Sequence, residues 1–178
     1  MELERKFMQF GAGLEVQDGA VIAGYASLFD VPDQGGDVVA AGAYGASLAQ
    51  LQVRGRSVKM LWQHDPARPI GVWDEVREDA RGLYVKGRLL VDVAQGREAM
   101  ALIEAGAIDG LSIGYRTKQA TKEGGTRRLV EVELWEVSLV TFPMLPEARV
   151  AAKADGLAVA DIRDMTAAIE AARQEMAG

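Results

Sequence analysis

The stretch Val130-Glu-Val-Glu-Leu-Trp-Glu-Val-Ser-Leu-Val140 decides the fold class, because it reads as the centre of a long β-strand over 127–142. Apolar and polar residues alternate along it, and a period of two is typical of a strand with one buried face. Parity places the following residues on one face: Val130, Val132, Leu134, Glu136, Ser138 and Val140. Glu136 is therefore predicted to interrupt an apolar face.

A carboxylate on an apolar face is costly unless it is paired or hydrogen-bonded, so Glu136 predicts a partner. Two interpretations stay open at this point. Glu136 either belongs to a functional site, where it orients a basic group, or it is a structural acid held by a backbone or arginine contact.

Strand-like and helical patterns precede this stretch in a strand-rich order. We expect a hairpin about Asp18-Gly19, a loop over 30–37, a short helix over 42–51, a strand over 57–62, a hairpin of 70–78 with 82–90, a helix over 94–105 ending at Gly106, a strand over 111–117 and a turn over 122–126. The aspartates of the 30–37 loop do not have the spacing of a helix-loop-helix calcium site, which favours a turn-forming loop. The order predicts one α+β domain dominated by strands.

The C-terminal segment changes to an alanine-rich composition. Apolar residues recur there at steps of three and four, which predicts an amphipathic helix: Val159, Ile162, Met165, Ile169, Ala172 and Met176. We therefore expect a domain over 1–150 and a C-terminal helix within 151–178. This helix is expected to pack on its own domain, to form a subunit interface, or to begin a tail.

The composition excludes several classes of protein. The chain has 178 residues with 26 acidic and 20 basic side chains, a net charge of −6, so it lacks the basic excess of a typical nucleic-acid binder. It has no apolar stretch of about 18 residues, and its N-terminus is charged where a signal peptide turns apolar. The absence of cysteine excludes thiolate metal sites and a cysteine nucleophile. One histidine, His64, is left for chemistry that needs an imidazole.

The segment Gly110-Leu-Ser-Ile-Gly114 matches the G-x-S-x-G pattern and makes Ser112 a candidate nucleophile. The hydrolase elbow is excluded, because a strand-like run follows Ser112 and the only histidine precedes it. A base that precedes the serine remains possible, since a neutral imidazole takes a proton from a serine hydroxyl near neutral pH. The alternatives are a structural strand serine at 112 and a surface histidine at 64.

With His64, Ser112 and Glu136 as candidates, the sequence resembles the tailed-bacteriophage prohead proteases, capsid-maturation serine peptidases related in fold to the herpesvirus maturation protease. The resemblance covers about residues 20 to 150. Five blocks in order carry it: Gly24-Tyr-Ala-Ser-Leu-Phe-Asp30, Leu61-Trp-Gln-His-Asp65, Ile70-Gly71, Gly110-Leu-Ser-Ile-Gly-Tyr115 and Leu134-Trp-Glu-Val-Ser-Leu-Val-Thr-Phe-Pro143.

The resemblance implies an α+β fold with a strand-dominated, herpesvirus-protease-like β-barrel flanked by helices. It implies His64 as general base, Ser112 as nucleophile and Glu136 as the group that orients the imidazole, where the herpesvirus relatives use a second histidine. Asp65 and Asp109 are the alternatives for the orienting acid.

The resemblance also implies that the oxyanion donors are backbone N–H groups of the 142–149 loop. Pro143 and Pro146 have no N–H, which leaves Met144 and Leu145 as candidates.

The implied partners are proteins. Members of the family cleave a scaffold or the N-terminal segment of the major capsid protein, and then themselves, inside the assembling procapsid in the host cytoplasm. A homodimer or higher homo-oligomer is expected, with no nucleic acid, membrane, cofactor or metal. The competing interpretations are a non-catalytic scaffold-like or minor capsid component on the same fold, and an unrelated serine esterase, which the residue order disfavours.

Overall fold

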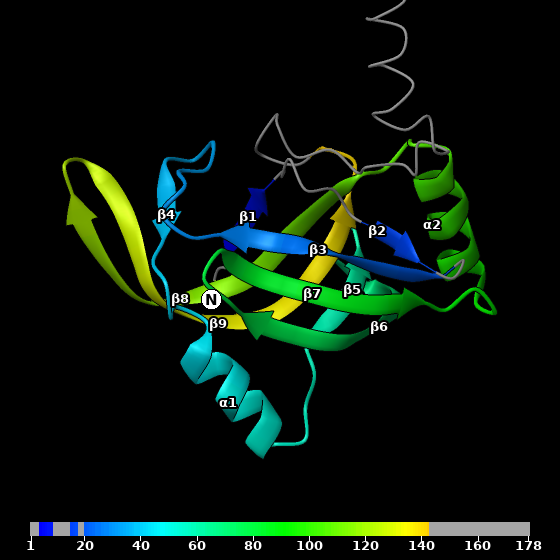
Figure 1. The fold of residues 1–178 in the computed structure, drawn as a ribbon, viewed down its shortest axis with the longest axis horizontal. Coiled ribbons are helices and arrows are strands. Elements are labelled where there is room, and N and C mark those ends of the chain that lie inside the picture. The colour runs from blue at the N-terminus through cyan, green and yellow to red at the C-terminus, as the bar shows by residue number, and fades with distance from the viewer. Residues whose placement is uncertain (1–3, 9–14, 18–19, 143–178) are drawn as a thin grey trace, which may run out of the picture.

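The computed structural model of the protein describes residues 4–8, 15–17 and 20–142. Within these ranges the chain forms one nine-stranded sheet and two helices (Figure 1). The elements are β1 (Glu4–Met8), β2 (Glu15–Gln17), β3 (Val21–Leu28), β4 (Asp37–Val39), α1 (Gly45–Val53), β5 (Lys59–Trp62), β6 (Asp65–Glu78), β7 (Gly82–Leu89), α2 (Ala94–Glu104), β8 (Gly110–Glu123) and β9 (Thr126–Val140).

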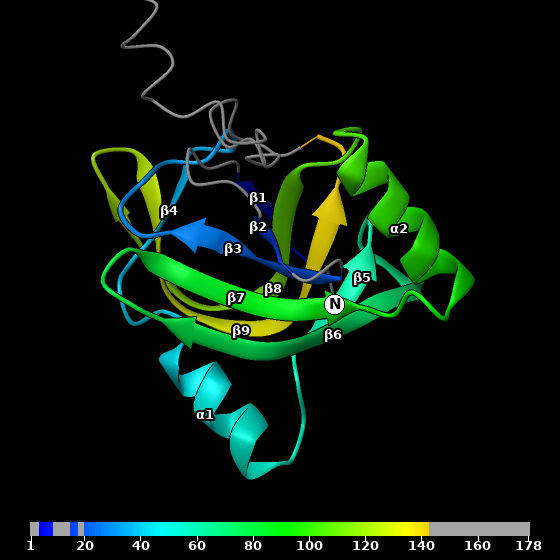
Figure 2. The same ribbon diagram turned by 45° about the vertical axis from the view of Figure 1, so that its right-hand side comes forward.

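The sheet has the strand order β1-β8-β9-β5-β6-β7-β3-β2 and curls strongly, as Figures 1 and 2 show. Strand β3, near one edge of this order, contacts β8, near the other. β4 and β5 both run parallel to β9, β4 along its first residues and β5 along its last, whereas the other neighbours are antiparallel. Helix α1 packs against β9 and β6, and α2 against β6 and β7. The expected strand-dominated α+β fold is confirmed.

Turns fall where glycine and aspartate predicted them. Gly124 and Gly125 connect β8 to β9 with φ of 58° and 91°, the left-handed pair that a two-residue hairpin turn requires. Asp79 closes the β6–β7 turn, because its Oδ1 accepts hydrogen bonds from the N–H groups of Arg81 and Gly82. Gly106, with φ of 68°, ends α2 as expected.

A bulge at Trp135 corrects the parity prediction for β9. Gly114 pairs with Glu136 and Tyr115 with Leu134, so Trp135 is the extra residue at this point of β9. The core contains Leu134 before the bulge and Val137 after it, which reverses the alternation. The prediction that Glu136 shares a face with Val132 and Leu134 is therefore wrong.

After the bulge, the two faces of β9 have different neighbours. Val137 and Leu139 point into the hydrophobic core, where each buried side chain contributes about 1.5–3 kcal/mol. Glu136 and Ser138 alternate with them and lie on the opposite face of the sheet. The polar residues of β9 thus gather on a face that the core does not occupy.

Some predicted elements differ in extent or lie outside the described residues. The short helix runs to Val53 instead of residue 51, and the strand predicted from 57 begins at Lys59. β2 and β3 pair antiparallel as expected, although the Asp18-Gly19 turn is not among the described residues. The C-terminal helix, its Val159 to Met176 stripe and the 150/151 boundary also lie outside them. Neither helix of the described part is long and apolar enough to cross a membrane.

Candidate active site

Three adjacent strands bring the candidate residues together. Ser112 on β8 lies directly opposite Ser138 on β9, and Ser138 in turn pairs with Leu61 on β5. His64 follows β5 by two residues, in the turn that leads into β6. These register partners all lie on the sheet face opposite the core, because their neighbours Ile113, Val137 and Met60 are the core residues of the three strands.

His64 and Glu136 form a buried pair. Nδ1 of His64 lies 2.5 Å from Oε1 of Glu136, and the two residues are 5% and 4% exposed. A carboxylate only accepts hydrogen bonds, so Nδ1 carries the proton and donates it to Oε1. In the neutral imidazole this tautomer leaves the basic lone pair on Nε2. The geometry is that of an imidazole oriented by an acid.

Ser138 connects both members of this pair. Its hydroxyl donates to Oε2 of Glu136 at 2.6 Å and accepts the backbone N–H of His64 at 3.1 Å. Both carboxylate oxygens of Glu136 are thereby held, one by the imidazole and one by Ser138. Parity predicts that Ser138 lies on the face of Glu136, but the sequence pattern assigns it no role. The available signal was its spacing of two residues from Glu136.

The backbone at His64 has an uncommon conformation. Trp62 pairs with Asp65, so Gln63 and His64 form a two-residue hairpin turn, and both have left-handed φ angles of 52° and 61°. Such turns favour Asn-Gly, because residues with a Cβ atom resist this region. Strained non-glycine residues of this kind concentrate at functional sites. The hydrogen bond from the His64 N–H to Ser138 helps to hold the turn.

Gly114 makes room for the acid. A Cβ atom added at Gly114 would lie 2.0 Å from Oε1, 2.7 Å from Cδ and 2.8 Å from Cγ of Glu136. The Glu136 side chain therefore lies directly over the Gly114 backbone. The last glycine of the G-x-S-x-G match is required here by packing and not by a nucleophile elbow.

The structure separates the candidate acids by their contacts. Asp65 accepts the backbone N–H of Ala67 through Oδ1 at 2.9 Å, and Glu136 is the carboxylate in contact with the imidazole. Asp109 lies in the segment that enters β8. Ser112 itself is fully buried, with 0% of its surface exposed.

Two further expectations can be compared with the described residues. The candidate oxyanion donors Met144 and Leu145 lie outside them, as do Pro143 and Pro146. Within 4–8, 15–17 and 20–142, no group of three histidine, cysteine, aspartate or glutamate side chains is arranged to hold a metal ion.

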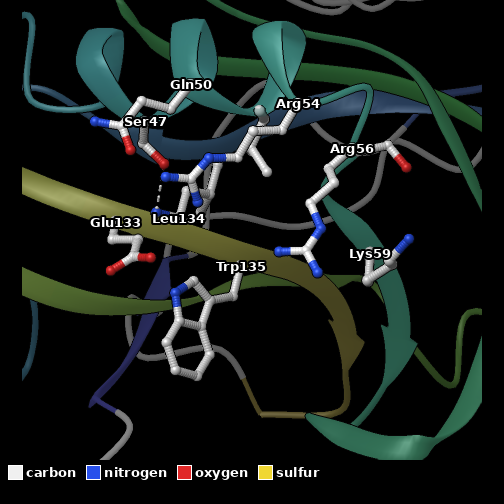
Figure 3. Close-up of a pocket in the computed structure, with 10 residues that line it drawn as sticks. Ser47, Gln50, Arg54, Arg56, Lys59, Glu133, Leu134 and Trp135 are labelled. Atoms are coloured by element: carbon white, nitrogen blue, oxygen red, sulfur yellow. Dashed lines mark hydrogen bonds between the residues drawn. The ribbon is translucent and has the colours of Figure 1, made fainter.

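A groove of about 430 Å³ lies between the C-terminal end of α1 and the strands β5 and β9 (Figure 3). Its lining does not include His64, Ser112 or Glu136. It consists of Ser47, Gln50, Leu51, Arg54, Arg56, Ser57, Lys59, Glu133, Leu134 and Trp135. We call it the α1 groove.

Comparison with known proteins gives consistent matches. The sequence model of the family described as Caudovirus prohead serine protease matches residues 12–161. The prohead protease of Enterobacteria phage HK97 is 31% identical over 150 residues, which are 82% of this chain and 65% of the relative. The capsid polyprotein of Pseudomonas phage PAJU2 is 32% identical over 101 residues, 52% of this chain and 15% of the relative. The chain thus matches less than two thirds of the length of either curated relative.

A solved structure shares the fold. The bacteriophage T4 capsid assembly protease superposes with a TM-score of 0.62 at 18% sequence identity, over 80% of this chain and 98% of that one. The curled sheet with its helices is therefore the fold of that protease.

Proposed function

From the fact that the chain belongs to the Caudovirus prohead serine protease family, we propose that it is a serine endopeptidase of phage capsid maturation. Ser112 is the nucleophile, His64 the general base, and Glu136 the acid that orients the imidazole. The observation that carries the proposal is the buried contact between His64 and Glu136, one strand away from Ser112. The family resemblance drawn from the sequence agrees with this assignment.

The chemistry is acyl transfer through one imidazole. Oγ of Ser112 attacks the peptide carbonyl carbon while Nε2 of His64 takes the hydroxyl proton. Glu136 stabilises the imidazolium that forms. Nε2 then gives the proton to the leaving amine, the C–N bond breaks, and an acyl-enzyme remains. Water attacks this ester with His64 again as base, and the acid product leaves Ser112 free.

Ser138 and Gly114 act through Glu136 as positioning residues. The Ser138 hydroxyl fixes Oε2, and the missing Cβ of Gly114 lets the carboxylate descend to the imidazole. A fixed acid keeps the proton of His64 on Nδ1, and so keeps Nε2 basic.

The burial of Ser112 bears on how the enzyme works. A carbonyl carbon reaches Oγ only when the atoms that cover Ser112 move aside, because its exposed fraction is 0%. The same observation favours a second candidate function, a non-catalytic scaffold-like or minor capsid component on this fold. The two functions differ in whether Ser112 reacts at all.

The proposed substrates are the scaffold or the N-terminal segment of the major capsid protein, and the enzyme itself. Both curated relatives are named for the prohead or the capsid, which supports this class of substrate. The proposed setting is the procapsid in the host cytoplasm, with the chain as a homodimer or larger homo-oligomer. We also propose the relationship to the herpesvirus maturation protease, and a domain over 1–150 followed by a C-terminal helix within 151–178.

The test is cleavage in the presence of the capsid proteins. The chain is expressed with the major capsid protein and scaffold of its phage, as wild type and as Ser112→Ala, and products are followed on gels and by mass spectrometry. We expect cleavage by the wild type and none by the variant. Equal processing by both would exclude Ser112 as nucleophile, whereas intact substrates with assembled capsids in both would favour the non-catalytic component.

A further inference from the structure

We propose that the α1 groove binds an acidic segment of the protein substrate, three to four residues from the bond that is cut. This inference rests on the proposed function and adds a substrate class to it. The groove has a volume of about 430 Å³, within the range of binding pockets.

Three cations surround the opening of the α1 groove. Arg54 and Arg56 follow α1, and Lys59 begins β5, and all three side chains belong to exposed residues. Among the residues that the structure describes, none of the three is in an ion pair. The one carboxylate in the lining, Glu133, is already bound by Arg116 and Lys118. The groove therefore carries uncompensated positive charge in a chain whose net charge is −6.

The backbone holds two of these cations in defined places. Gly55 has a φ of 60°, its N–H donates to the carbonyl of Gln52, and the N–H of Arg56 donates to the carbonyl of Leu51. This is a Schellman motif, in which glycine ends a helix and reverses the chain. Arg54 and Arg56 consequently emerge on either side of one tight turn, beside the same opening (Figure 3).

The lining of the groove also contains apolar side chains. Trp135 is 39% exposed because the bulge displaces it from the regular alternation of β9. Leu51 and Leu134 line the groove with it. Exposed tryptophan beside arginine is typical of protein interaction sites. The lining therefore fits a peptide that offers both carboxylates and an apolar side chain.

The register of the sheet connects the groove to the reacting serine. Lys59 pairs with Glu136, and Ser138 pairs with Ser112, so Lys59 is two strands across and two residues along from Ser112. Strand spacings of about 4.8 Å and a rise of about 3.3 Å per residue give a separation of about 12 Å. An extended peptide covers this distance with three to four residues.

A peptide suits the groove better than a nucleic acid. The three cations at one opening match two or three carboxylates, but they do not form the extended row of cations that a continuous phosphate backbone requires. The net charge of −6 opposes a polyanion further, since phosphate binding needs a surplus of cations along the strand. Two or three carboxylates with an intervening leucine place their charges at the cations and their apolar group at Trp135.

The test measures binding without catalysis. The Ser112→Ala chain is titrated with the acetylated, amidated peptide Ala-Glu-Leu-Glu-Ala, and the indole N–H signal of Trp135 is followed by NMR. The signal is assigned by its loss in Trp135→Phe. We expect a saturable shift, weakened about tenfold or more by Arg56→Glu with Lys59→Glu. The matched control Lys122→Glu, an exposed cation far along β8, should leave the affinity unchanged.

Three outcomes would overturn the proposal. The first is that the Ala-Gln-Leu-Gln-Ala peptide binds as tightly as the glutamate peptide. The second is that the double charge reversal leaves the affinity for the glutamate peptide unchanged. The third is that a five-nucleotide oligothymidylate binds more tightly than the glutamate peptide. Because the Ser112→Ala chain is used throughout, these outcomes do not depend on whether the protein is a protease.

A second measurement locates the acidic residues of the substrate relative to the bond that is cut. A peptide library is cut by the wild type, and products are sequenced by mass spectrometry. We expect acidic residues to be enriched three to four positions from the cut on one side, and basic residues in their place for Arg56→Glu with Lys59→Glu. Cleavage without this exchange contradicts the groove assignment. No cleavage of any peptide contradicts the proposed function, while the NMR titration still decides the groove.

Discussion

The carboxylate of Glu136 lies over the backbone of Gly114, so close that an added methyl group would stand 2.0 Å from Oε1. The two residues are register partners on β8 and β9, and Ser112 lies two residues before Gly114 on the same face. The position of the Glu136 carboxylate therefore depends on the absence of a side chain at Gly114.

Gly114→Ala should therefore disable the site. The new methyl group pushes Glu136 away from His64, and a displacement of about 1 Å lowers a rate by about a hundredfold. Overpacking also costs about 1–3 kcal/mol of stability. The rate of Ser112 labelling by a fluorophosphonate and the free energy of unfolding measure both effects. Gly35→Ala, where the nearest atom is 3.3 Å away on a side chain, is the control. Wild-type labelling by Gly114→Ala would show that Glu136 need not stay in place.

Ser138→Ala should slow labelling of Ser112 by about tenfold to a hundredfold. The substitution frees Oε2 of Glu136 and leaves the buried N–H of His64 without its acceptor, which costs about 1–3 kcal/mol of stability. Ser27→Ala, which removes another fully buried hydroxyl on β3, should leave the labelling rate unchanged. If Ser138→Ala and Ser27→Ala show the same rate of Ser112 labelling and the same free energy of unfolding, Ser138 is only a structural residue.

Glu136→Gln should lower the labelling rate by about a thousandfold to ten-thousandfold with the fold retained. The amide of glutamine donates to Nδ1, favours the wrong tautomer of His64 and removes the charge that stabilises imidazolium. Asp65→Asn should have little effect, because Asp65 contacts the Ala67 N–H and not the imidazole. Slow labelling of Ser112 in Asp65→Asn together with fast labelling in Glu136→Gln would show that Asp65, and not Glu136, orients the imidazole. Unfolding of Glu136→Gln would favour a structural acid.

Asp79→Asn should change how the free energy of unfolding depends on pH in the acidic range. Burial raises the pKa of Asp79, but hydrogen bonds from Tyr25, the Arg81 N–H, Arg77 and the Gly82 N–H outweigh it and hold this pKa at about 2, below its usual 3.8. The ionised carboxylate therefore stabilises the fold above about pH 4, and this contribution disappears as the pH falls from about 4 to about 2. Urea titrations across this window should show a shallower decline for Asp79→Asn than for wild type. Parallel declines would contradict the pKa assignment.

Much of the fold was predictable because local signals and tertiary packing agree. Alternation located β6, β7 and β9, and Gly106 ended a helix where no other residue fits as well. The face of Glu136 was not predictable. One extra residue at Trp135 reverses the parity, and a bulge depends on pairing with Tyr115 and Gly114 that strand patterns do not contain.

The candidate site also has features that the sequence predicted and features that it did not. That Glu136 needs a partner was predictable from the cost of burying an acid, although the acid occupies the other face of β9. That His64 is this partner was implied by the family resemblance and not by the strand pattern. The role of Ser138 had one local signal, its spacing of two residues from Glu136. The α1 groove arises from residues distant in sequence, such as Arg54 beside Trp135, so no local pattern marked it.

The most direct test of the central claim is fluorophosphonate labelling of the full chain at neutral pH, with the modified residue located by mass spectrometry. We expect one adduct on Ser112, none in Ser112→Ala, and a rate at least about a thousandfold lower in His64→Gln, because all proton transfer from Ser112 passes through the single histidine. Labelling of His64→Gln at the wild-type rate, or an adduct on another residue, would contradict it.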